Sequence, residues 1–448
     1  MKKRAWPKFA VALMLSFAVL AGCAQSQTPE AAPAEGGSNA SEGGGSAEKI
    51  ELRFVSWDTA QASVDIMNNA KAAFEKENPN ITIKIETSPY ENYMTKLQTE
   101  IAAGSAPDMI QIGERDFRKY LEKGIVIDLM PYAEGEIKYD LADINPTILE
   151  VIKVDGKLPV LNIGVATTGI FYNKKLFDAA GIPYPKEDWT WEEFVEIAKR
   201  LTVEENGKIV QYGANLNLSK DWVETLVQSN GGKYLSDDGK TTKGALDSPE
   251  TVEALQFIVD LYNVHKVAPN PADLMALKGI DLFGTGMVAM NMNGSWATAD
   301  LRANPELDFG VAGLPRFADG KRANLMYTSG YGISSDSKHP EEAWKFLQFL
   351  TSPETDSGKA LAGFNLTASK KLAEATNQAS DPYYGVFLKE LDHIANSAYF
   401  INPYWGATGD KVLNPAIEAM VLNNENVQQA LSNVTNALDK ELADQAAQ

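Results

Sequence analysis

The alternation of strands and helices near the start of the folded region most constrains how this chain can fold. Residues 50–55, 81–85 and 108–112 have the apolar patterns of strands. Between them, residues 63–77 and 90–103 place apolar side chains on one helical face. A strand–helix–strand–helix–strand order predicts a parallel sheet covered by helices, so we expect an α/β fold.

Polar and aromatic side chains follow two of these strands. Trp57 and Asp58 come after the first strand, and Glu114, Arg115 and Asp116 come after the third. Because ligands of such sheets bind outside the carboxyl ends of the strands, both groups are candidate binding residues. The second group also fits a solvated loop, since runs of charged residues commonly lie in solvent, and the sequence leaves both interpretations open.

A second α/β region is predicted from Gly164 onwards. Its clearest signal is Thr190 with Glu193, a capping box at the start of a helix over 191–203. The chain has 448 residues, more than one hydrophobic core usually serves, and therefore suits about two domains. Further elements are predicted as strands at 168–172, 309–314 and 332–334 and as helices at 174–180, 221–229, 249–263, 340–351, 410–422 and 426–443.

The segment from Asp281 to Trp296 joins a strand to a candidate binding residue. Residues 287–292 have the pattern of a buried strand, and Asn293 and Gly294 form a turn before Trp296. A glycine at a strand end allows a ligand or another backbone to come close, and tryptophan offers a flat apolar face with one N–H donor. By itself the segment fits either a buried core Trp296 or a Trp296 that contacts a ligand.

The N-terminal sequence predicts an exported, lipid-anchored protein. Residues 1–22 have the basic start and short apolar run of a signal peptide. The residues before Cys23 resemble the lipobox of bacterial lipoproteins, whose cysteine carries the lipid, and Cys23 is the only cysteine. Residues 24–48 contain no Val, Ile, Leu or aromatic residue, which predicts a flexible linker between the lipid and the folded part.

Charge and composition exclude several function classes. The formal net charge of −19 argues against a nucleic-acid partner, because phosphate contacts need clustered Lys and Arg. A single cysteine allows no disulfide within the chain, and the three histidines lack the spacing of a zinc site. We therefore expect neither a metal nor a cofactor.

Six short motifs occur in an order that is typical of one protein family. They read Ser105-Ala106-Pro107-Asp108, Phe171-Tyr172-Asn173-Lys174, Trp189-Thr190-Trp191-Glu192-Glu193, Phe283-Gly284-Thr285-Gly286-Met287, Asn293-Gly294-Ser295-Trp296 and Pro340-Glu341-Glu342-Ala343-Trp344. Together they resemble the family 1 extracellular solute-binding proteins, the sugar receptors of ABC importers, of the maltodextrin-binding kind. The resemblance covers nearly all of residues 49–445.

The resemblance implies two interleaved α/β lobes joined by hinge crossings, a periplasmic-binding-protein-like fold of type II. We expect the crossings near Asn162–Ala166, Phe309–Leu314 and 335–350. The expected N-terminal lobe comprises residues 49–163 plus 312–344, and the expected C-terminal lobe comprises 164–311 plus 345–448.

The same resemblance implies roles for individual residues at a sugar site between the lobes. Trp296 is expected to stack on a pyranose ring, while Glu114, Arg115 and Asp116 bind hydroxyl groups. One departure concerns the strand over 163–168, which lacks the carboxylate that maltodextrin receptors carry there. Residues in loops that line the cleft of relatives are Trp222, Tyr331, Tyr404 and Trp405.

The predicted function is that of a non-enzymatic receptor. It would capture a sugar, most simply an oligosaccharide, and deliver it to the permease subunits of an ABC transporter. We expect a monomer anchored by lipid on the extracytoplasmic face of the cell membrane. Two alternatives stay open: a lipid-anchored secreted glycoside hydrolase, which needs two carboxylates about 5–10 Å apart, and a receptor for a non-sugar polar solute.

Overall fold

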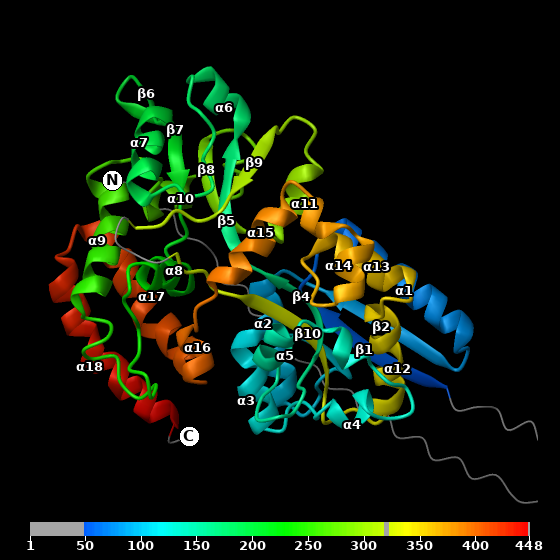
Figure 1. Ribbon diagram of the computed structural model, residues 1–448. Helices are drawn as coiled ribbons and strands as arrows, with labels where there is room; N and C mark the ends of the chain where they lie inside the picture. Colours follow the sequence, from blue (N-terminus) through cyan, green and yellow to red (C-terminus); the bar gives the residue numbers. More distant parts are fainter. Residues whose placement is uncertain (1–48, 318–321, 447–448) are drawn as a thin grey trace, which may run out of the picture. The chain divides into compact units, whose positions relative to one another are not determined.

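The computed structural model describes residues 49–317 and 322–446. The signal peptide, Cys23 and the linker predicted before this region lie outside the described residues. Within the described residues, the strands form two separate sheets, and helices surround each sheet (Figure 1). The mixed α/β architecture with two sheets confirms the predicted fold class.

The first sheet contains the strands predicted near the start of the chain. β1 pairs in parallel with β2 and with β3, as the sequence indicates. The later strand β10 lies antiparallel between β3 and β4. In spatial order the strands are β2 (Ile81–Thr87), β1 (Ile50–Ser56), β3 (Met109–Gly113), β10 (Tyr327–Ile333) and β4 (Leu161–Ala166).

The second sheet is built from the middle of the chain. Its pairings are mixed, since β7 and β8 are parallel, whereas β5 is antiparallel to both β8 and β9. The second sheet also contains the antiparallel hairpin of β6 and β7, which was not predicted from the sequence. In spatial order the strands are β6 (Val203–Glu205), β7 (Lys208–Asn215), β8 (Val288–Gly294), β5 (Thr168–Asn173) and β9 (Phe309–Ala312).

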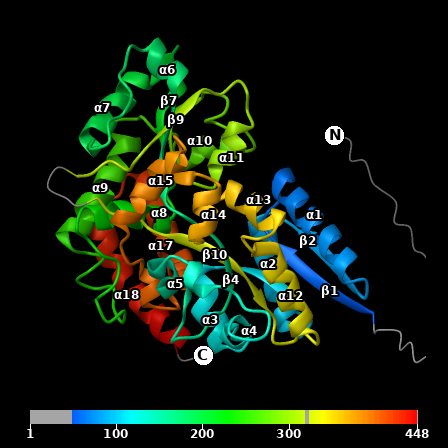
Figure 2. The same cartoon turned by 45° about the vertical axis from the view of Figure 1, so that its right-hand side comes forward.

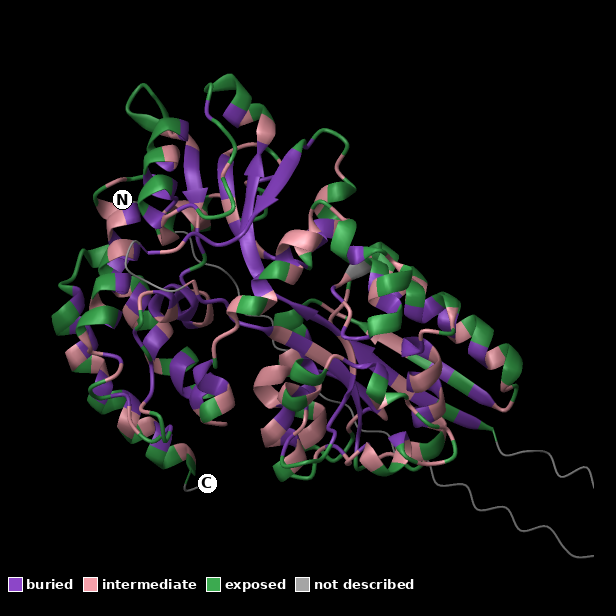
Figure 3. Cartoon of the chain, viewed as in Figure 1, coloured by how far each residue is buried: buried purple, intermediate pink, exposed green. Residues whose placement is uncertain are grey.

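Among the described residues, eight α-helices pack with the first sheet, and we call this assembly the first lobe. Its strands are largely buried, while the outer helix faces are exposed (Figure 3). The helices are α1 (Gln61–Glu77), α2 (Tyr90–Ala102), α3 (Phe117–Glu122), α4 (Met130–Ala133), α5 (Pro146–Ile152), α12 (Pro340–Thr351), α13 (Asp356–Phe364) and α14 (Lys370–Ala375).

The other α-helices of the described residues belong with the second sheet, and we call this assembly the second lobe. The predicted capping box of α7 is present, since Thr190 Oγ1 accepts from Glu193 N and Glu193 Oε2 accepts from Thr190 N. The helices are α6 (Lys174–Ala179), α7 (Trp191–Leu201), α8 (Lys220–Ser229), α9 (Pro249–Asn263), α10 (Pro271–Ala276), α11 (Ala297–Arg302), α15 (Tyr384–Glu390), α16 (Ala398–Ile401), α17 (Trp405–Asn423) and α18 (Val427–Ala446).

The chain changes from one sheet to the other at three places. It leaves β4 for β5 through Thr167, returns between β9 and β10, and leaves again between α14 and α15. The last place differs from the expected crossing at 335–350. In the structure Phe346 of α12 packs against Phe54 and Phe74, with ring centroids 6.0 and 5.2 Å apart, so this helix covers the first sheet (Figure 2).

Candidate functional site

Three aromatic rings from both lobes meet in one cluster. Trp222 lies on α8, Trp296 follows the end of β8, and Tyr327 begins β10 of the first sheet. The ring centroids of Trp296 and Tyr327 are 5.4 Å apart, and each ring lies 6.0 Å from that of Trp222. We call these three residues the aromatic cluster. Trp296 is 39% exposed, which places it at the surface and not in a core.

A cluster of four charged side chains lies next to the aromatic cluster. Arg115 of the first lobe approaches two carboxylates of the second lobe, with Nη1 3.4 Å from Asp221 Oδ2 and Nη2 2.7 Å from Asp410 Oδ2. Lys220 Nζ contacts the same two carboxylates at 2.7 and 3.0 Å. We call Arg115, Lys220, Asp221 and Asp410 the ion cluster. Since two cations face two carboxylates, the ion cluster offers no uncompensated charge to a ligand.

Electrostatics within the ion cluster keep Arg115 charged. Burial lowers the pKa of the Arg115 guanidinium, but the nearby Asp221 and Asp410 outweigh this effect and raise the pKa above its ordinary value. The Lys220 side chain is fully buried and neutralised by the same carboxylates, as a buried cation requires. Arg115 therefore acts as a permanent cation at this site.

Glu114 connects the end of β3 with the start of β10. Its Oε2 accepts a hydrogen bond of 2.8 Å from Thr328 N, the residue after Tyr327. Burial raises the pKa of the Glu114 carboxyl to about 7, although the hydrogen bond from Thr328 and the charge of Arg115 act in the opposite direction. Glu114 thus lies beside the aromatic cluster and titrates near neutral pH.

Trp57 and Asp58 are held by contacts within the first lobe. Trp57 packs edge-to-face on Tyr90 and Tyr93, with centroids 5.4 and 5.3 Å apart. Gln111 accepts from Trp57 N and donates to Asp58 Oδ2. Burial raises the pKa of Asp58, while the Gln111 and Ser56 hydrogen bonds lower it. Trp57 and Asp58 therefore lie at the predicted strand end, where packing and hydrogen bonds within the first lobe hold them in place.

Two of the predicted site residues lie in hydrophobic cores. Tyr331 has no exposed surface and packs edge-to-face on Phe54, with centroids 4.8 Å apart. Trp405 has no exposed surface either and lies beside Tyr234 at 5.6 Å. These positions differ from the predicted cleft-lining role. Both are aromatic residues next to glycine, a pattern that fits core packing as well as ligand contact.

Two other predicted residues lie at the edges of the site. Asp116 belongs to the same short turn as Arg115, but its carboxylate pairs with Lys119 at 3.4 Å within the first lobe. Tyr404 caps α17 and packs partly buried against the core of the second lobe. Of the ten predicted residues, Glu114, Arg115, Trp222 and Trp296 lie together, in or beside the aromatic cluster and the ion cluster.

Sequence reasoning missed Tyr327, Asp221, Lys220 and Asp410. Asp221 stands directly before Trp222, which was predicted as a site residue, so its position in the sequence could have indicated it. Tyr327 and Asp410 come from parts of the chain without a recognisable motif. Their contact with residues more than a hundred positions away follows only from the fold.

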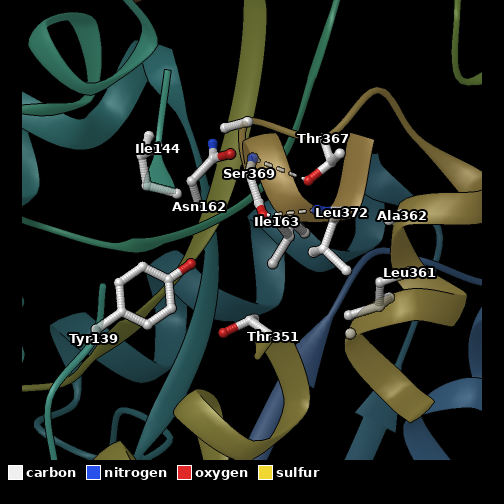
Figure 4. Close-up of a pocket in the computed structure, with 12 residues that line it drawn as sticks. Tyr139, Ile144, Asn162, Ile163, Thr351, Leu361, Ala362, Thr367, Ser369 and Leu372 are labelled. Atoms are coloured by element: carbon white, nitrogen blue, oxygen red, sulfur yellow. Dashed lines mark hydrogen bonds between the residues drawn. The ribbon is translucent and has the colours of Figure 1, made fainter. Parts of the chain in front are cut away.

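Two small cavities in the described part of the chain lie away from the aromatic cluster. One has a volume of ≈ 20 Å³ and is lined by Tyr139, Asn162 and Ser369 among others (Figure 4). The second, of ≈ 60 Å³, lies beside Tyr93 and Lys96. The first cavity has room for little more than one water molecule and the second for a few, so both are much smaller than an oligosaccharide.

Metal sites and membrane spans are not found among the described residues. No group of three or more His, Cys, Asp or Glu side chains is placed to hold a metal ion in residues 49–317 and 322–446. No helix of that same region combines the length and the apolar character that crossing a bilayer requires.

The chain matches a known family over most of its length. The model of the bacterial extracellular solute-binding proteins matches residues 57–356. A binding protein of Brucella abortus is 30% identical over 312 residues, which is 68% of this chain and 73% of the relative. The galactooligosaccharide-binding protein of Bacillus subtilis is 24% identical over 329 residues, covering 71% and 73% of the two chains.

Solved structures agree with this match. The ABC substrate-binding protein of Listeria monocytogenes in complex with cycloalternan superposes with a TM-score of 0.79 and 28% identity. The alignment covers 88% of this chain and 100% of that one. This agreement extends the similarity from the matched residues to nearly the whole described fold.

Proposed function

The chain belongs to the bacterial extracellular solute-binding proteins, and from this premise we propose that it captures an oligosaccharide between its lobes for an ABC importer. The aromatic cluster is the observation that carries this proposal. Pyranose rings present apolar C–H faces, which aromatic rings cover, and hydroxyl groups, which carboxylates and amides bind. Trp296 offers such a face because it is 39% exposed although two other rings contact it.

The charges around the aromatic cluster favour a neutral ligand. Arg115 and Lys220 are each paired with Asp221 and Asp410, so neither cation is free to bind a phosphate or carboxylate. An anion would need an unpaired cation or an unoccupied helix N-terminus. Relatives that bind galactooligosaccharides or cycloalternan support the same ligand class.

We further propose that Cys23 carries a lipid that holds the receptor at the outer face of the cell membrane, and that the receptor acts as a monomer. The support for the anchor is the lipobox-like sequence before Cys23. The folded part would meet the permease subunits of the importer near the membrane surface. The two lobes would close on the sugar, as expected for domains joined by hinge crossings.

Tryptophan fluorescence titration tests the proposed ligand class. A panel of neutral oligosaccharides, monosaccharides, amino acids, polyamines and a glycerophosphodiester should give saturation with one or more neutral oligosaccharides. Saturation only with a charged solute would contradict the proposal. An assay for released reducing sugar on the bound oligosaccharide should detect no turnover, because hydrolysis would indicate a glycoside hydrolase instead.

A further inference from the structure

The ion cluster joins the two lobes through a single residue of the first lobe. Arg115 lies in the short turn after β3, whereas Asp221 lies on α8 and Asp410 on α17 of the second lobe. The Nη2–Oδ2 distance of 2.7 Å to Asp410 is that of a charge-assisted hydrogen bond. Contacts of this length form only when the lobes meet, so they belong to one relative position of the lobes.

The acceptor side of this contact is already assembled within the second lobe. Lys220 is fully buried and holds Asp221 and Asp410 together, with Nζ–Oδ1 distances of 2.7 and 3.0 Å. Asn414 donates to Asp410 Oδ1, and its own Oδ1 accepts from Lys220 N. We call Lys220, Asp221 and Asp410 the socket. One cation and two carboxylates give the socket a charge of −1, which the guanidinium neutralises.

Two glycines of α17, the helix that carries Asp410, leave room for the side chains of Arg115 and Lys220. A Cβ atom at Gly409 would lie 2.3 Å from Lys220 Cδ, so no other residue fits there without moving the buried lysine. Gly406, one turn earlier, faces the Arg115 guanidinium, with Nη2 3.5 Å from the position of a Cβ. Glycine is disfavoured inside helices, and Gly409 is explained by the space that the socket needs.

We propose that Arg115 is a positioning residue that locks the lobes together in the socket, and that it regulates closure without contacting the sugar. This inference rests on the proposed function, since it concerns how the same site closes. A ligand that binds the closed form gains apparent affinity when that form is favoured beforehand. Asp221 and Asp410 hold the two terminal guanidinium nitrogens from the second lobe, which supports a role of Arg115 between the lobes.

Spin labels on the two lobes of the otherwise full-length Cys23→Ser protein test this inference. Lys123 after α3 and Ala443 on α18 are exposed positions for the labels. In the empty protein, Arg115→Gln should shift the distance distribution towards longer distances. Arg118→Gln is the matched control, because Arg118 is a cation three residues away whose ion pairs with described residues are to Glu122 and Asp155 of the first lobe. It should leave the distribution unchanged.

The affinity of the same variants completes the test. Arg115→Gln should weaken oligosaccharide binding about tenfold, whereas Arg118→Gln should change it by less than about twofold. Asp410→Asn in the Arg115→Gln background should have less effect on the distances than Asp410→Asn alone, because the partner is already gone. Weaker binding with unchanged distances would overturn the inference and make Arg115 a direct ligand contact.

Salt gives an independent readout of the lock. Raising the salt concentration to about 1 M should lengthen the mean distance in the empty protein, because partly exposed ion pairs are screened. The Arg115→Gln variant should lack this response, and a response equal to that of the parent protein would count against the lock. Since these measurements use the empty protein, failure of the lock is distinguishable from failure to bind any sugar.

Discussion

The ring of Trp296 lies directly over Gly294, since a Cβ atom at position 294 would be 2.3 Å from Trp296 Cη2. Gly294 ends β8 in the second sheet, so the rigid strand determines where the ring lies. The ring in turn contacts Trp222 and Tyr327. A glycine thus positions the most exposed member of the aromatic cluster, as the sequence of the turn indicated.

Gly294→Ala should displace this ring and weaken sugar binding. The added methyl group overlaps the ring of Trp296, which is exposed enough to swing away without disturbing a core. We expect oligosaccharide affinity to fall by about tenfold, or about 1.4 kcal/mol, measured by calorimetric titration. Gly363→Ala is the control, because no described atom outside its own stretch of helix lies within 4 Å of its Cβ position, and it should leave affinity unchanged.

Trp296→Ala should separate a ligand-binding role from a structural role. Stacking on an aromatic ring is worth about 1–3 kcal/mol, so affinity should fall roughly 5–150-fold at 25 °C. The free energy of unfolding of the empty protein should change little, because the side chain is 39% exposed. Fluorescence titration and urea denaturation of one variant give both numbers.

Trp405→Ala provides the matched comparison. Its side chain is fully buried beside Tyr234, so truncation should cost about 3–5 kcal/mol of unfolding free energy. If Trp296→Ala behaved like Trp405→Ala, with a large loss of stability and near-normal affinity, Trp296 would be a core residue and the aromatic cluster would lose its role.

The local sequence pattern predicted most of the helices and strands, because apolar residues recur in them with a clear period. The strands and helices from β1 to β3, the capping box of α7 and helices such as α9 and α12 occur where the sequence indicates. The sequence could not show which sheet α12 covers. Its apolar face suits either sheet, and only the tertiary contacts of Phe346 with Phe54 and Phe74 decide.

The two tyrosines of β10 show a second limit of prediction from the sequence. Tyr327 and Tyr331 are four residues apart, so a regular strand would point both to the same side. β10 itself is regular, since its pairing with β3 has no register shift, and the bulge in its pairing with β4 leaves Ile163 of β4 unpaired. Tyr331 lies further along the strand and enters the core on Phe54, whereas Tyr327 is the first residue of the strand and joins the aromatic cluster. Both tyrosines belong to one strand, so which of them enters the core and which reaches the second lobe follows from tertiary contacts and not from the local sequence pattern.

Cys23→Ser should release the receptor from the membrane. If Cys23 carries the acyl chains, its removal eliminates the anchor, because stable attachment needs two or more chains. Immunoblots of membrane and soluble fractions should show the variant in the soluble fraction with unchanged sugar affinity. Retention of the variant in the membrane fraction after a high-salt wash would contradict lipid anchoring through this cysteine.

Glu224 on α8 should make stability depend on pH near neutrality. Its carboxylate accepts from Ser397 Oγ, Ala398 N and Gln228 Nε2 at 2.7–2.9 Å, and it is almost completely buried. Burial raises its pKa to about 7, although the bonds from Ser397 and Ala398 oppose this shift. The folded chain therefore keeps a proton that the unfolded chain releases near the ordinary Glu value of 4.5.

The sign of this effect follows from the protons bound. Between about pH 4.5 and about pH 7 the folded state binds more protons than the unfolded state, so the free energy of unfolding falls as pH rises and levels off above. In the parent protein this decrease in the free energy of unfolding should be on the order of 3 kcal/mol, and Glu224→Gln should remove it. Urea denaturation from about pH 5 to about pH 8 measures the difference. Glu196→Gln is the control, because the hydrogen bond from Lys199 lowers the pKa of Glu196 below its ordinary value and so moves it away from this range. A Glu224→Gln profile parallel to that of the parent protein would show that the Glu224 carboxyl is already ionised throughout this range.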